Sequence, residues 1–379
     1  MQRIAALIAL VVTVIVIAAW IARDRGAEPV EAIESVVDAP VDPAPRTKSP
    51  GIDFPALSRE TGPLAERLPE GQQSKRECTD RELVAAFEER LDSDKSRARH
   101  AALASTLTES GNTELVLAGA MLSGAESPFD AIERTQLAMQ LGPQHPLVLW
   151  QAAELCSREQ QGEFCGDPTL RLNSEQILGR NGAYWSKIAA GRIQRGEKEA
   201  ALAALKRAAV EPQWDDYWIE RVMLLERALA VGSDVSYALR ITEAMTVTAG
   251  DDGLELSLMT RACRRFIAEG EEWLGACTGF GNRLVASRGL LHQVQGYELL
   301  RNIYKRQGDD YKLAEVSADL DELKIALEEI EEADFTGLMT DDRIAALFID
   351  EHAANGELAA IRQMAEETRR IKSDPDYDS

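Results

Sequence analysis

The chain has 379 residues, with 64 acidic and 42 basic side chains and a formal net charge of −22. Such a charge repels nucleic acid and anionic lipid headgroups, so we expect no nucleic-acid partner and favour a basic protein or peptide, although solubility accounts for much of the excess. The spacings of the five cysteines and four histidines fit no zinc pattern, so we predict no metal site.

The first predicted element is a membrane span. Residues 4–22 contain no charge, glycine or proline, and Thr13 is their only clearly polar member. As a helix this stretch measures about 28 Å, close to the thickness of a bilayer's hydrocarbon core. We therefore predict a retained anchor over residues 1–23. A cleaved signal peptide fits less well, because the apolar stretch is long. The residues around Trp20, where the stretch ends, also lack the pair of small residues that a signal-peptide cleavage site requires. A buried core helix is the remaining alternative.

Residues 24–75 are predicted to form a flexible linker. Eight of the 14 prolines lie between Pro29 and Pro69, and several acidic residues repel one another along the first part. Proline disfavours helix and promotes extended structure. Few apolar residues are available to pack this stretch against a domain.

Residues 76–379 are expected to form an all-α domain. Residues 79–82 match a capping box before an apolar run. Glycines and short polar clusters then recur at intervals typical of helices joined by tight turns, for example at Gly111, Gly142, Gly196 and Gly270. No alternating β-pattern of useful length interrupts them.

Tryptophans mark a candidate repeat within this domain. Trp150, Trp185 and Trp218 are 35 and 33 residues apart, on either side of a 34-residue period. The best unit places a turn at Gly196 and helix-contact residues at Trp185, Ile188, Ala189, Ala201, Leu205 and Ala208, followed by Pro212.

These residues resemble the tetratricopeptide repeat family over about residues 113–232. The resemblance implies a right-handed α-solenoid of helical hairpins, whose concave face binds a protein or peptide. Arg192 stands where the family prefers an aromatic residue. In the preceding unit, Thr135 stands where a large aromatic residue is usual. An irregular helical bundle is the alternative.

Four cysteines form two local pairs around predicted turns. Cys156 and Cys165 lie symmetrically about Gln160-Gln161, and Cys263 and Cys277 each lie seven residues from Gly270. In a helical hairpin such positions face each other, as a disulfide requires. Small buried cysteines are the alternative.

Disulfides persist in oxidising compartments, so they predict a single-pass inner-membrane protein with its C-terminal domain in the periplasm. The charges flanking the span are nearly balanced and do not orient it. Cys78 is left over, as a free thiol or an intermolecular link. The alternative places the domain in the cytoplasm with all five cysteines reduced.

No catalytic or cofactor-binding signature is present. Gly279-Phe280-Gly281 lacks the further glycine or lysine of a phosphate loop. Trp214, Tyr217 and Trp218 form an aromatic cluster that is a candidate partner-binding surface, with core packing as its alternative. An apolar stripe is likewise either a docking helix or an ordinary amphipathic one; it comprises Leu320, Leu323, Leu327 and Ile330.

The sequence therefore predicts a membrane-anchored extracytoplasmic helical-repeat scaffold, held in the inner membrane through residues 4–22. It would bind an unidentified protein or peptide in envelope assembly or quality control, without catalysis, cofactor or metal. The alternative is an extracytoplasmic helical enzyme acting on envelope polymer, because a catalytic site assembled from distant segments leaves no motif.

Overall fold

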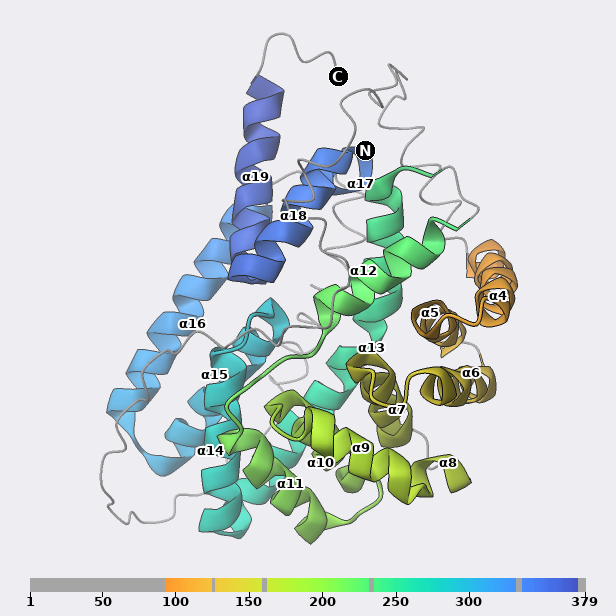
Figure 1. Ribbon diagram of the computed structural model, residues 1–379. Coiled ribbons are helices and arrows are strands. Elements are labelled where there is room, and N and C mark those ends of the chain that lie inside the picture. The colour runs from red at the N-terminus through yellow and green to blue at the C-terminus, as the bar shows by residue number, and fades with distance from the viewer. Residues whose placement is uncertain (1–92, 125–126, 159–161, 232–234, 332–335, 374–379) are drawn as a thin grey trace.

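A computed structural model of the chain describes residues 93–124, 127–158, 162–231, 235–331 and 336–373 (Figure 1). The predicted span and linker, the capping box and Cys78 all lie outside these residues. Within the described part of the chain, no helix is both long and apolar enough to cross a bilayer.

The described residues are helical, as the sequence predicts, and they contain no β-strand. A single isolated bridge joins Asn181 to Gln213. The helices are α4 (Ser93–Glu109), α5 (Thr113–Gly124), α6 (Pro128–Leu141), α7 (Pro146–Arg158), α8 (Gly162–Gly166), α9 (Pro168–Leu178), α10 (Gly182–Gln194), α11 (Lys198–Val210), α12 (Trp218–Leu229), α13 (Tyr237–Phe266), η1 (Ile267–Glu269), α14 (Glu271–Val285), α15 (Leu290–Gln307), α16 (Asp310–Glu331), α17 (Thr336–Thr340), α18 (Asp342–Asn355) and α19 (Glu357–Ser373).

Neighbouring helices pack as hairpins, among them α5 with α6, α10 with α11, α14 with α15 and α18 with α19. Other contacts join helices that are distant in the sequence: α11 packs on α14, and α12 packs on both α5 and α18. The long helix α13 runs through the middle of the molecule in Figure 1 and contacts α10, α12, α15 and α18. Residues from separated hairpins are thereby brought to one central region.

The hairpin of α10 and α11 spans the residues in which the sequence resemblance is strongest. Trp185 is only 7% exposed, and Gly196 makes the turn with a φ of +74°, a conformation that glycine adopts without strain. The alanines of the unit are fully buried, which lets the two helices approach closely; they are Ala189, Ala201 and Ala208.

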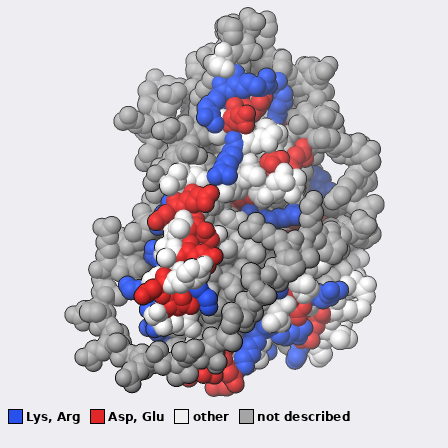
Figure 2. All heavy atoms as spheres, turned by 90° about the vertical axis from the view of Figure 1, so that its left-hand side faces the viewer, with Lys and Arg blue, Asp and Glu red and all other residues white. Residues whose placement is uncertain are grey.

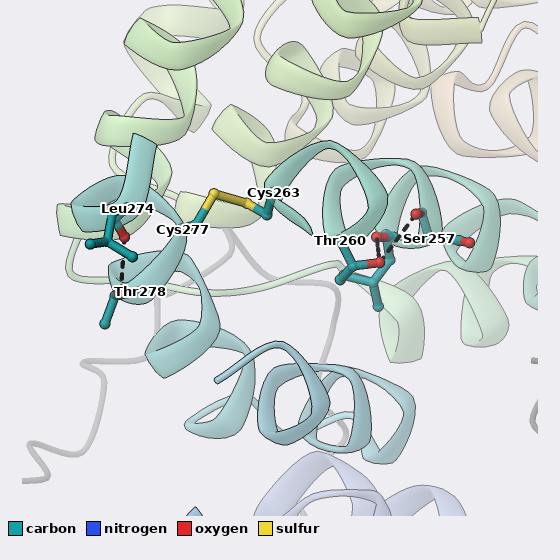
Figure 3. The surroundings of a disulfide bond; sticks show 7 residues. Ser257, Thr260, Cys263, Leu274, Cys277 and Thr278 are labelled. Atoms are coloured by element: carbon teal, nitrogen blue, oxygen red, sulfur yellow. Dashed lines mark hydrogen bonds between the residues drawn. A yellow bond between two sulfur atoms is a disulfide. The ribbon is translucent and has the colours of Figure 1, made fainter. Parts of the chain in front are cut away.

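Both predicted cysteine pairs are at disulfide distance. Cys156 of α7 is bonded to Cys165 of α8, with their Cα atoms 5.5 Å apart. Cys263 of α13 is bonded to Cys277 of α14, with their Cα atoms 5.6 Å apart, and Figure 3 shows this bond linking the two helices. The second pair is fully buried. It therefore fixes α14 to the central helix.

Candidate functional site

The segment between α11 and α12, together with the first residue of α12, carries the aromatic cluster and two adjacent aspartates, and Asn181 anchors it. The Asn181 amide donates to the backbone oxygen of Asp215 at 2.6 Å, and its side-chain oxygen accepts from the Asp215 N–H at 3.0 Å. The same oxygen accepts from the N–H of Ala183, which caps α10. One side chain therefore fixes the segment to the start of α10.

Two local turns shape the end of this segment. The Asp215 carboxylate accepts from the Tyr217 N–H at 2.8 Å, and the Asp216 carboxylate accepts from the Trp218 N–H at 3.1 Å. Short carboxylate side chains form such turns readily. Tyr217 has a φ of +54° and is the one non-glycine residue with positive φ among those described. Its left-handed backbone conformation is unusual for an aromatic residue and is held by these turns.

The structure separates the three aromatic side chains. Tyr217 is 2% exposed and meets the buried Trp150 edge-on, with ring centroids 5.3 Å apart. Trp214 and Trp218 are half-buried; Trp214 lies 6.1 Å from the His292 ring and Trp218 lies 4.9 Å from the His352 ring. Tyr217 is therefore a packing residue, whereas partner contact by the two tryptophans stays a prediction.

Three carboxylates gather beside these rings, and the pKa values of two of them, Asp215 and Glu220, are raised. The pKa of Glu220 is raised to about 7, mainly because the carboxyl is buried away from water and secondly because of the negative charge of Asp215. Asp215 reaches solvent, but the protein surrounding its carboxylate and the charge of Asp216 raise its pKa to about 6. Arg288 lowers both pKa values, against these effects.

Two histidines complete the group. Asp216 Oδ2 lies 3.5 Å from His292 Nδ1. Burial lowers the pKa of His352 to about 4, with Asp216 acting in the opposite direction, so His352 is neutral at pH 7. Within the described part of the chain, His352 Nδ1 is buried and has no hydrogen-bond partner. We call Trp214, Asp215, Asp216, Trp218, Glu220, His292 and His352 the acidic aromatic site.

A buried ionic network adjoins this site. Lys187 Nζ lies 2.7 Å from Glu255 Oε2 and 3.8 Å from Glu154 Oε2. Arg221 reaches the same Glu154 oxygen at 3.1 Å. Each of these four residues is at most 7% exposed. Lys187 also lies 4.8 Å from the centre of the Trp150 ring, at a distance that allows a cation–π attraction.

A cavity of about 30 Å³ connects the network to the site. This volume has room for about one water molecule. Its lining comes from α7, α10, α13, α15 and the segment before α12: Trp150, Ala183, Ser186, Lys187, Trp214, Asp216, Glu255, Leu256 and His292.

The arrangement suits two kinds of chemistry. A bound cation would favour the charged forms of Asp215 and Glu220 and lower their raised pKa values. A carboxyl with a pKa near 7 is also suited to proton transfer at neutral pH. Among the described residues, no group of three or more histidine, cysteine or carboxylate side chains is arranged to hold a metal ion.

The sequence singles out the aromatic residues of this candidate site but not its other members. His292 and His352 follow no ligand spacing, yet the fold brings both close to Asp216. The ionic network joins four helices and leaves no local pattern. The two adjacent aspartates inside the aromatic cluster were the one available signal.

The chain matches no protein-family model, no curated protein and no solved structure.

Proposed function

We propose that the chain is a membrane-anchored extracytoplasmic scaffold that binds a basic segment of a protein or peptide partner at the acidic aromatic site. The observation that carries this proposal is that three carboxylates, Asp215, Asp216 and Glu220, share one site with two half-buried indole rings. Carboxylates attract an ammonium or guanidinium group, and indole faces stabilise it further.

The anchor, the compartment and the repeat belong to the same proposal. The apolar stretch over residues 4–22 supports attachment to the inner membrane. The two disulfides support an extracytoplasmic domain. The buried alanines of the α10 and α11 hairpin support a degenerate tetratricopeptide-like solenoid. Envelope assembly or quality control is the setting in which such a scaffold acts.

The test is titration of the full chain, in zwitterionic lipid nanodiscs, with a short peptide that carries lysine and arginine at its centre. The variant D215N/D216N/E220Q should abolish saturable binding. The control E109Q/E133Q/E366Q removes the same charge from exposed positions outside the site and should bind as the parent does. If both variants lost binding equally, net charge alone would explain the binding, and the proposal would be contradicted.

A pH series adds a second readout. Cation binding requires ionised carboxylates, and the pKa values at this site are about 6 and about 7. Binding should therefore strengthen as the pH rises from 5 to 8. Attraction by ordinary exposed carboxylates, which titrate near pH 4, would not change over this interval.

A helical enzyme acting on envelope polymer is the second candidate. The pKa of Glu220 near 7 favours it, because such a carboxyl can donate a proton at neutral pH. Release of soluble fragments from purified cell-wall polymer by the parent, and its loss in E220Q, would support the enzyme over the scaffold.

A further inference from the structure

Helix α16 has two opposite faces of different character. Its inner face packs against α15 and α19 through residues that are at most 8% exposed: Val316, Leu320, Leu323 and Ala326. Leu320 and Leu323 belong to the apolar stripe noted in the sequence, so the described part of that stripe faces the core. It is not a docking surface.

The outer face of α16 carries a second apolar line. Tyr311 is 80% exposed and Ile325 is 57% exposed. With the exposed Ala318 between them they recur every seven residues, and Ala314 lies three residues after Tyr311. This is the spacing of a seam that packs against another helix. The alanines allow a partner helix to approach closely, and the two large side chains lie about 21 Å apart along the axis.

Acidic side chains flank this line. Glu315, Asp319 and Glu322 are exposed, and none of the described basic side chains lies within ion-pair distance of them. The nearby lysines are engaged elsewhere: Lys312 pairs with Asp309 and Lys324 pairs with Asp321. Figure 2 shows acidic and uncharged residues on the side of the molecule where α16 lies, with basic residues beside them.

We propose that the outer face of α16 docks a basic amphipathic helix of a partner protein. Its apolar residues would pack along Tyr311, Ala314, Ala318 and Ile325, and its flanking lysines or arginines would pair with the three exposed acids. A second copy of this chain would bring like charges together and is disfavoured. This surface is separate from the acidic aromatic site, so each proposal can fail without the other.

The test uses two synthetic helical peptides with the same apolar heptads, one flanked by lysine and the other by glutamate. The full chain in zwitterionic nanodiscs should bind the lysine peptide, after subtraction of binding to empty nanodiscs. E315Q/D319N/E322Q should weaken this binding about tenfold, because three interfacial ion pairs are lost. The matched control E109Q/E133Q/E366Q should not weaken it.

Charge reversal makes the test decisive. E315K/D319K/E322K should prefer the glutamate peptide, and A318W should block both peptides by filling the seam. Circular dichroism of each variant checks that the fold is intact. An unchanged peptide preference after charge reversal would overturn the proposal. Dimerisation of the parent that A318W abolishes would also overturn it, because the occupant would then be a second copy.

Discussion

Replacing Lys187 with methionine should destabilise the protein by about 3–5 kcal/mol, the typical cost of breaking a buried ion pair. The lysine is 3% exposed, and its ammonium lies 2.7 Å from Glu255 Oε2. Without it, the buried Glu255 carboxylate loses its cation and retains the hydrogen bond from Ser157. Methionine preserves the apolar part of the side chain beside Trp150, so the loss of stability reports on the removed positive charge.

The pH dependence of this loss has a definite sign. Burial already raises the pKa of Glu255 above 4.5, while Lys187 opposes the rise. Removing Lys187 raises that pKa further in the folded state. The protonated carboxyl is tolerated at low pH, so the destabilisation should grow as the pH rises from 5 to 8.

The assay is urea unfolding of the full chain in detergent at pH 5 and pH 8. Lys206→Met is the control, because Lys206 forms an exposed pair with Glu272 at 2.7 Å and should matter little. The reasoning is refuted if Lys187→Met costs no more than the control. It is also refuted if its cost is greater at pH 5 than at pH 8.

Three further predictions concern stability. Gly182→Ala should cost about 1–3 kcal/mol in urea unfolding, because its Cβ would lie 2.7 Å from the Ala208 carbonyl oxygen. The pKa of Glu220 is about 7 in the folded state and 4.5 in the unfolded state. The parent protein should therefore lose stability as the pH rises from 4.5 through 7. The stability of E220Q should not show this decrease. The double variant Cys263→Ser/Cys277→Ser should lower the free energy of unfolding by about 2–4 kcal/mol, measured without reductant. For each of the three variants, an unfolding midpoint equal to that of the parent would contradict the prediction.

The helical class and the cysteine pairs could be predicted because both are local. Glycine and proline end helices through their own backbone constraints, and each cysteine pair spans one turn. The same locality located the hairpin around Gly196. These features depend on residues close together in the chain.

The acidic aromatic site could be predicted only in part because it depends on tertiary packing. Trp214 and Trp218 attracted attention as a dense cluster, but Tyr217 between them is turned into the core by its left-handed backbone. His292 and His352 reach the same place from α15 and α18. The packing of α11 on α14 and α12 on α18 places them there, and no local pattern encodes it.

The central claim of the proposed function is that the helical domain folds outside the cytoplasm. Thiol mapping by mass spectrometry tests it most directly, on the full chain purified from its native membranes with free thiols blocked before lysis. We predict linked peptides that join Cys156 to Cys165 and Cys263 to Cys277. Blocked, unlinked thiols at all four positions would place the domain in a reducing compartment and contradict the account.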